Sequence, residues 1–542
     1  MKRKLIVLML CLVAVFALSF AGCGKSEDTD TTDTEASARE AVTLNMWLVS
    51  EKEISAETEA AVEEALNELT QAKYTTKVDL VFLTEDAYFA ALDEKLTLAA
   101  EHKESEGPAL VLPGMAEETD EVVETTAETF VNELGQKLLK YPDVEEHQID
   151  IVFLAGKELY ERYASEGKLS AMDTNLNATS KVLKDYIYPS FLEQIKYEKS
   201  TYAIPNNHLI GEYTYLLVNK ALAEKYYFDT DDLTSFTACA DLIAEIGAYE
   251  TVAPVLSYAD PVNLHYWLGN NDMALIASYV PTQATLGSRT VMRSIFDTAS
   301  FTEHMLLMQR CKDNGWFAAD PANTEDFGVA IVKGGYDLVE KYSDKYDVKV
   351  LTYPTLEEET VYESMFAVTA YTENFDRAME VITLINTTAE AKNILQYGVE
   401  NVHYEFDDDG SFVQLNDDYC MNNLYTGNAF LAYPANGASA DVWENAKAAN
   451  RDSKVSPYYG LGADWATVTE GFIESLRELS DGYMERMHAC TTEEELSTFF
   501  ATAKQELSSN ELFKAAFSTD SDSNSPYAVY SRWFQRLWPS AE

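Results

Sequence analysis

The chain has 542 residues, 46% of them hydrophobic, and a formal net charge of −51 from 40 basic and 91 acidic residues. This excess of negative charge repels nucleic acid and anionic lipid, so the composition argues against a nucleic-acid partner or adsorption to a membrane surface. The apolar content is sufficient for a large core, and the length predicts two or three domains.

The first residues predict export. Basic residues at positions 2–4 precede an apolar run, 5–20, which is followed by Ala21-Gly22-Cys23. This pattern is typical of a secretory signal peptide, and the run is shorter than the roughly 20 residues of a membrane-spanning helix. The end of the run resembles a bacterial lipobox, which implies that Cys23 is acylated, for example with palmitate. The alternative is an ordinary signal peptide with a chance cysteine. We therefore expect a signal peptide over 1–22 and an extracytoplasmic, lipid-anchored protein at the cell membrane.

A tether is expected next, over 23–41. From Gly24 to Ala41 the sequence has no aromatic and no large aliphatic residue, so it cannot bury enough apolar surface to offset its ordering entropy. We expect this spacer to be disordered and the folded part to begin at Val42.

Strands and helices then alternate. Apolar periodicity predicts strands at 43–49, 77–83 and 149–154, and helices at 55–73, 86–102 and 156–169. Such an order predicts a parallel sheet with crossover helices. The acidic segment 105–148 interrupts the order, and we expect one helix and a surface loop within it.

The second part of the chain is more helical. The segment 202–206 suits a crossing between lobes, because Pro205 fixes its own φ and keeps Ile204 extended. Helices are expected to dominate 237–311 and the remainder to about 510. Between them we expect strands at 327–332, 348–354 and 365–371, a helix at 376–388, and a hairpin at 403–415 that turns at Asp409-Gly410.

Catalytic and metal-binding motifs are missing from the sequence. It contains no HExxH, GxSxG or GxxxxGK[ST] motif, and its seven histidines lack ligand spacing. We expect no enzyme activity, no cofactor and no metal, although carboxylate pairs for glycoside hydrolysis stay open among so many acids. Four scattered cysteines allow three disulfide connectivities or free thiols, and the sequence does not choose between them: Cys239, Cys311, Cys420 and Cys490.

Several segments carry a family resemblance in their order along the chain. They are DIVFL, LYERYASEGKLSAMD, YAIPNN, YTYLLVNKALAEKY, NGWFAADPAN, AIVKGG, VTAYTENFDRAMEVITLIN and YGVENVHYEFDDDG. From about Val42 to the end, the chain resembles family 1 extracellular solute-binding proteins, the lipoprotein receptors of ABC importers. The segment 105–148 departs from the family pattern.

The resemblance implies an α/β, two-lobe periplasmic-binding-protein-like fold of the class II type, with ligand held between the lobes and an extended helical C-terminal region. We expect lobe 1 to comprise 42–203 and 326–365, and lobe 2 to comprise 204–325 and 366–542. Strands should cross between the lobes near 203–206 and 366–370. The implied partners are a small ligand and an ABC transporter permease, and the protein should be a monomer held at the membrane by its lipid alone.

A sugar site needs aromatic platforms beside hydrogen-bonding side chains. Residues of these types near strand ends or in expected loops are candidates for ligand binding, although each could equally pack in a core: Trp47, Glu51, Asn207, Trp267, Asn270, Tyr336, Tyr404 and Trp443. Trp316 and Trp533 are expected to pack. We therefore expect a receptor that delivers a small neutral ligand, with an oligosaccharide favoured. The alternatives are a surface lipoprotein glycoside hydrolase and a peptide receptor of the same fold.

Overall fold

The computed structural model describes residues 39–105, 129–131, 137–256, 275–279, 291–434, 438, 441–456, 459–460, 467–468, 470–518 and 524–537. The expected signal peptide, Cys23, almost all of the tether, Trp267 and Asn270 lie outside these residues. No helix among the described residues is both long and apolar enough to cross a bilayer.

Two compact units divide the chain. One comprises 1–40 and 120–139, and its described part contains an antiparallel pair of short strands, β3 (Thr129–Val131) and β4 (Lys137–Leu139). No helix lies among the described residues between 106 and 148, where one is expected. The other unit, 41–119 and 140–542, contains everything described below.

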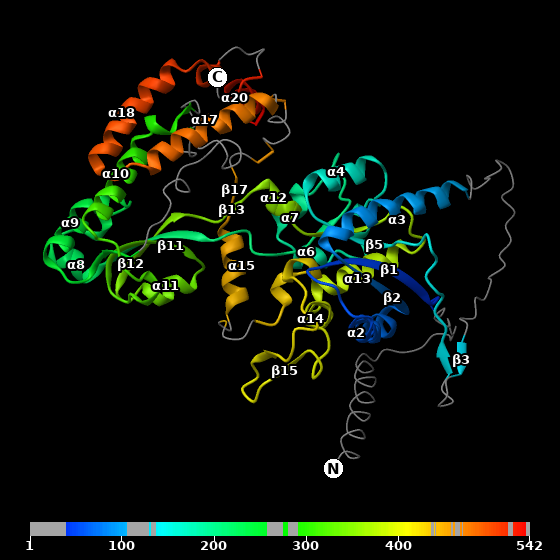
Figure 1. Cartoon of the computed structure of the whole chain (residues 1–542). Coiled ribbons are helices and arrows are strands. Elements are labelled where there is room, and N and C mark those ends of the chain that lie inside the picture. The colour runs from blue at the N-terminus through cyan, green and yellow to red at the C-terminus, as the bar shows by residue number, and fades with distance from the viewer. Residues whose placement is uncertain are drawn as a thin grey trace, which may run out of the picture. The chain divides into compact units, whose positions relative to one another are not determined.

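A first sheet of five strands carries the N-terminal core (Figure 1). Its order is β2 (Thr76–Thr84), β1 (Val42–Ser50), β5 (Ile151–Leu154), β14 (Met365–Val368) and β6 (Ile204–Pro205). β1 runs parallel to β2 and β5, whereas β14 is antiparallel to β5 and β6. The predicted parallel arrangement of the first three strands is therefore confirmed.

Amphipathic helices bury their apolar faces against this sheet. In α2, the side chain of Ser55 accepts a hydrogen bond from Thr58 N at the N-terminus, and Val62 and Leu66 are buried. In α13, Ala378 and Ile382 are buried, as the periodicity predicts. The helices of this part are α2 (Ala56–Tyr74), α3 (Glu85–Ser105), α4 (Lys157–Ser165), α5 (Asp173–Asn177), α6 (Leu183–Tyr186), α7 (Pro189–Gln194), α12 (Glu358–Tyr362), α13 (Phe375–Thr387) and α14 (Ala389–Tyr397).

The hydroxyl of Tyr88 joins β1 to β5 beyond the point where the two strands pair. The strand register ends at Trp47↔Val152. The Tyr88 hydroxyl, carried by α3, accepts from Phe153 N at 2.9 Å and lies 3.0 Å from Phe153 O and 3.3 Å from Trp47 O. Tyr88 is fully buried, so a helix side chain satisfies backbone groups that the strands leave unpaired.

A second sheet of four strands has the order β12 (Tyr346–Thr352), β7 (Tyr213–Asn219), β11 (Phe327–Gly334) and β8 (Ala253–Val255). β7 is antiparallel to both of its neighbours, and β11 is parallel to β8. The helices that contact this sheet include α8 (Lys220–Lys225), α9 (Ala240–Tyr249) and α11 (Asp337–Tyr342).

The strand pairing departs from the expected division into lobes. We expected 326–365 to join the first strands of the chain, yet β11 lies in the second sheet. We expected 366–370 to be a crossing that begins the other lobe, yet β14 lies inside the first sheet, between β5 and β6. Both segments are short apolar runs, and their antiparallel partners, β7 for β11 and both β5 and β6 for β14, lie far earlier in the chain.

A helical bundle follows in the C-terminal part, as the sequence predicts. It comprises α10 (Ala299–Asp313), α17 (Glu470–His488), α18 (Glu493–Ser509), α19 (Glu511–Ala516) and α20 (Pro526–Leu537). Phe296, Phe500 and Trp533 lie in its shared core. An antiparallel pair, β9 (Ile276–Tyr279) and β10 (Val291–Ser294), falls inside 237–311, where helices were expected to dominate.

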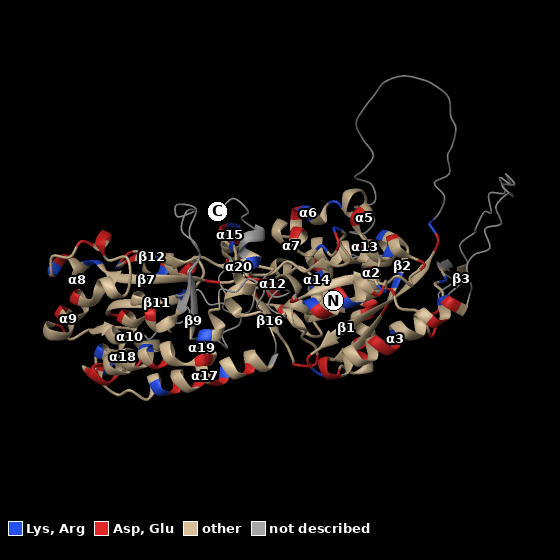
Figure 2. Cartoon of the chain, turned by 90° about the horizontal axis from the view of Figure 1, so that it is seen from above, with Lys and Arg blue, Asp and Glu red and all other residues tan. Residues whose placement is uncertain are grey.

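The remaining predictions concern the hairpin and the cysteines. β15 (Tyr404–Phe406) and β16 (Phe412–Gln414) form the predicted hairpin, and Gly410 has a φ of 81° at its turn. Cys239, Cys311, Cys420 and Cys490 are all free thiols. Acidic side chains are spread over helices such as α3 and α17 (Figure 2).

Candidate functional site

Two acidic residues emerge at one edge of the first sheet. β1 and β2 end at Ser50 and Thr84, which pair with each other, and the exposed Glu51 and Glu85 follow directly. Because the two strands are parallel, these side chains leave the sheet at the same carboxyl edge, where ligands of open α/β sheets bind.

Tyr425 lies close to this edge on η8 (Asn423–Thr426), a single turn of 3₁₀ helix. Its ring centroid is 4.8 Å from that of Phe153, and it is only partly buried. Burial, followed by the charges of Glu85, Glu51 and Glu363, raises the pKa of Tyr425. Asn422 Nδ2 donates to Glu51 Oε1 at 3.1 Å, which ties η8 to the end of β1.

An aromatic cluster occupies one edge of the second sheet. Because β11 and β12 are both antiparallel to β7, their ends lie beside the start of β7. Tyr213 opens β7, Tyr336 follows β11 and Tyr353 follows β12. The ring of Tyr213 lies 5.3 Å from that of Tyr336 and 5.9 Å from that of Tyr353. We call these three residues the tyrosine cluster.

The cluster is exposed on its outer side and anchored by one carboxylate. Tyr336 and Tyr353 are 36% and 46% exposed, whereas Tyr213 is buried. Asp452, at the end of α15 (Val442–Asp452), accepts hydrogen bonds from the hydroxyls of Tyr336 and Tyr213, each at 2.7 Å. These bonds lower the pKa of Asp452, and the bond to Asp452 raises that of Tyr336. Lys454 Nζ lies 5.4 Å from the ring centroid of Tyr353.

This arrangement offers flat apolar ring faces beside hydroxyl and carboxylate oxygens. Neutral sugars present apolar CH faces ringed by hydroxyl groups, so a partly exposed pair of tyrosines and an ionised aspartate match them in both respects. The glycines before Tyr336 serve local packing, since a Cβ on Gly334 would meet Leu338 Cδ1 at 2.4 Å.

Three segments within the described residues run between the parts that carry the two sheets. The first, 206–212, joins β6 to β7 close to the predicted crossing at 203–206. The second is 353–356, which contains β13 (Thr355–Leu356). The predicted crossing was 366–370 instead. The third, 450–456, contains β17 (Lys454–Val455), which runs parallel to β13.

Four of the predicted site residues are engaged in packing. Trp47 is 8% exposed, and its Nε1 donates to Asn45 Oδ1 at 2.7 Å. Asn207 is buried, with its Oδ1 accepting from Tyr188 N at 3.0 Å. Tyr404 is 5% exposed in an aromatic cluster under the hairpin. Trp443 packs against Phe430 and donates from Nε1 to the backbone of Ala432 at 2.6 Å.

Two of the predicted site residues, Glu51 and Tyr336, lie at exposed strand ends. Trp267 and Asn270 lie outside the described residues. Sequence reasoning missed Tyr353, Tyr425 and Asp452. Tyr353 lies at the end of a predicted strand and precedes a proline, which is a signal that could have identified it. The ligand-binding roles of all these residues stay predictions.

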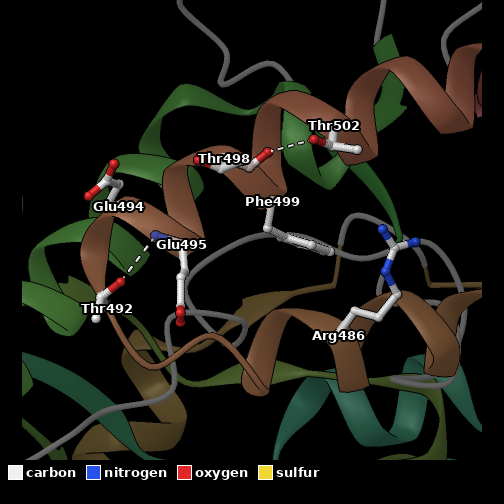
Figure 3. Close-up of a pocket in the computed structure, with 7 residues that line it drawn as sticks. All are labelled: Arg486, Thr492, Glu494, Glu495, Thr498, Phe499 and Thr502. Carbon is white, nitrogen blue, oxygen red and sulfur yellow. Dashed lines mark hydrogen bonds between the residues drawn. The ribbon is translucent and has the colours of Figure 1, made fainter.

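The concave surface between two C-terminal helices is less suited to a ligand than the tyrosine cluster. An open pocket of about 540 Å³ lies between α17 and α18 (Figure 3). Two of its charged side chains are already paired, Arg486 with Glu506 and Glu495 with the backbone and side chain of Thr491. No group of three or more His, Cys, Asp or Glu side chains in the described part of the chain could hold a metal ion.

Comparison with known proteins supports the family resemblance. No family model matches the chain. A "Carbohydrate ABC transporter substrate-binding protein" of Streptococcus pneumoniae serotype 4 (strain ATCC BAA-334 / TIGR4) is 21% identical over 318 residues, 55% of this chain and 64% of that protein. The chain thus spans slightly less than two thirds of this curated relative.

A solved structure of similar fold is the N-glycan transport solute binding protein from Streptococcus pneumoniae. It is 15% identical, covers 92% of this chain and 100% of its own, and has a TM-score of 0.53. This likeness confirms the predicted two-lobe α/β fold class. The chain is therefore similar in sequence to a carbohydrate ABC transporter substrate-binding protein, and it has the fold of a solute-binding protein, as the resemblance implies.

Proposed function

We propose that this protein is an extracellular solute-binding protein that delivers an oligosaccharide to an ABC importer. One observation carries the proposal: Tyr336 and Tyr353 of the tyrosine cluster are partly exposed at a sheet edge, where the ionised Asp452 accepts hydrogen bonds from Tyr336 and Tyr213. The similarity to a carbohydrate ABC transporter substrate-binding protein also supports a carbohydrate ligand.

A titration with a panel of neutral oligosaccharides tests the proposal. A ligand at 100 times its Kd stabilises the folded protein by about 2.7 kcal/mol, so a thermal-shift screen should find it and calorimetry should then give the Kd. Tyr336→Ala and Tyr353→Ala should each weaken binding by roughly 2 kcal/mol, about 30-fold, since each removes an aromatic anchor.

The matched control is Tyr249→Ala. Tyr249 is 74% exposed at the end of α9, outside the tyrosine cluster, so its loss should leave the Kd unchanged. Folded Tyr336 and Tyr353 variants with wild-type affinity would remove the tyrosine cluster from the site.

Incubating the protein with the oligosaccharide distinguishes a receptor from a glycoside hydrolase. A receptor returns its oligosaccharide intact, whereas a glycoside hydrolase yields shorter products that chromatography detects. A peptide receptor of this fold would respond to no sugar in the screen and would respond to peptides in a second thermal-shift screen.

The proposal extends to the lipid anchor at Cys23, a permease partner, a monomeric state and two lobes that close on the ligand. A ligand that contacts both lobes binds the closed form better and shifts the population towards it. Small-angle scattering should therefore report a smaller radius of gyration at saturation. An unchanged scattering curve would contradict closure.

A further inference from the structure

One buried amide side chain holds the first connecting segment. Asn450, on the last turn of α15, is 2% exposed. Its Nδ2 donates to His208 O at 2.7 Å, and its Oδ1 accepts from Ile210 N at 2.9 Å. In a parallel sheet, one residue bonds the carbonyl of a residue on the next strand and the N–H two positions further along that strand. Asn450 bonds the same two groups, His208 O and Ile210 N, through its side chain. Asn450 thus replaces a strand partner for the extended segment 206–212, which pairs with no strand of the described chain.

The same stretch of chain holds the other connections. Ser453 Oγ lies 3.1 Å from the hydroxyl of Tyr188, which belongs to the first-sheet part. Lys454 N donates to Pro354 O at 2.9 Å, and Ser456 N to Leu356 O at 2.8 Å. Asp452, which accepts hydrogen bonds from Tyr213 and Tyr336 of the tyrosine cluster, lies between Asn450 and Ser453 in the sequence.

Burial makes the two bonds of Asn450 strong determinants of backbone position. A buried amide or carbonyl group without a partner costs free energy, so the segment 206–212 stays where Asn450 can reach it. We call the two hydrogen bonds of Asn450 the clamp. Ala449, next to Asn450, lies in the core of the second-sheet part, so the clamp fixes the segment 206–212 to that part. Asn206 is bonded to Ser364 and so stays fixed to the first-sheet part. Only Asn207, whose Oδ1 accepts from Tyr188 N, lies between Asn206 and His208, so the flexible portion is reduced to the bonds around this residue.

We propose that Asn450 is a positioning residue that sets the range of hinge motion and, through it, the ligand affinity. It contacts no ligand itself. Without the clamp, the segment 206–212 samples more arrangements, and the fraction of molecules ready to close falls. If this fraction falls tenfold, the apparent Kd rises about tenfold, because affinity scales with the population of the competent state. The affinity part of this inference rests on the proposed function, whereas the part on hinge motion does not.

The test compares two asparagines that each bond a carbonyl and the amide two residues later; Asn393 Nδ2 also donates to Ala389 O at 2.7 Å in its own helix. Asn393, on α14, donates to Leu431 O at 2.8 Å and accepts from Tyr433 N at 2.7 Å, and it is 1% exposed. It therefore clamps a neighbouring segment as Asn450 does, but away from the segment 206–212. Asn450→Asp and Asn393→Asp each lose the donor at constant size, so both should lower Tm.

Ligand-free scattering and calorimetry with the oligosaccharide found in the screen then separate the two roles. Asn450→Asp should broaden the ligand-free distance distribution and raise the Kd about tenfold, whereas Asn393→Asp should change neither. Asn450→Ala, which lets water reach both backbone groups, provides a second variant. Equal losses of Tm with unchanged scattering and unchanged Kd overturn the proposal.

Two further outcomes are decisive. If both Asn450 variants fail to fold while the Asn393 variant folds, Asn450 is a folding determinant and the hinge role is rejected. If wild type binds no oligosaccharide, the proposed function fails, while the ligand-free scattering comparison still decides whether Asn450 restricts the hinge.

Discussion

Replacing Tyr88 by phenylalanine should weaken the first sheet near the carboxyl ends of β1 and β5. The Tyr88 hydroxyl is the partner of Phe153 N, at 2.9 Å, beyond the last paired residues of β1 and β5. Phenylalanine keeps the ring and its packing but leaves this buried N–H without an acceptor. An unsatisfied buried group costs about 1–3 kcal/mol, so we expect the free energy of unfolding to fall by about 2 kcal/mol.

Tyr215→Phe is the matched control. Tyr215 is 1% exposed, and its hydroxyl has no hydrogen-bond partner among the described residues. Removing that hydroxyl should therefore leave stability unchanged or raise it. The two variants make the same chemical change in equally buried tyrosines, and only the bonding of the hydroxyl differs.

Urea unfolding followed by tryptophan fluorescence measures the loss, because the Trp47 ring lies 6.3 Å from that of Tyr88. Hydrogen–deuterium exchange of the peptide that contains Phe153 gives a local measure, with faster exchange expected in Tyr88→Phe. Equal stability of the two variants, with unchanged exchange at Phe153, would refute the reasoning.

Two other predictions concern a buried acid and the anchor. Burial raises the pKa of Asp150 above its ordinary 3.8, although bonds from Thr372, Asn45 N and Gln148 oppose the shift. The folded state therefore binds this proton more tightly than the unfolded state, and the stability that Asp150 provides falls as pH rises through the raised value. In urea titrations, Asp150→Asn should gain stability relative to wild type as pH rises from the ordinary value of 3.8 through the raised pKa, and a relative loss would contradict this assignment. Cys23→Ala should release the protein from the membrane fraction of expressing cells, and retention equal to wild type would reject the lipid anchor.

Local patterns predicted much of the fold. β1 and β2 are runs of apolar residues with strand formers, and α13 repeats its apolar residues at helical spacing, so each could be identified within a short window. The sheets to which β11 and β14 belong could not be predicted in this way. Each strand is a short apolar run, and the strands that it pairs with are distant in sequence.

The candidate site was harder to predict for the same reason. Trp47 was expected at a binding edge, but β1 is covered on both faces and every side chain from Thr43 to Ser50 is buried, which leaves no free face. Tyr336 and Tyr404 look alike in sequence, yet only Tyr336 stands beyond the end of a strand. Asp452 ends a helix, and no local pattern indicates that its carboxylate meets two tyrosines from other elements.

The position of β14 also determines when the first sheet can form. β14 separates β5 from β6, although it is made 160 positions after Pro205. At a synthesis rate of about 5–20 residues per second, β5 and β6 therefore wait roughly 8–32 s for the strand that lies between them. Until Val368 has emerged, the sheet has a gap where its antiparallel strand belongs. Such a delay suits the export that the sequence predicts, because the first sheet stays incomplete while the N-terminal half of the chain crosses the membrane.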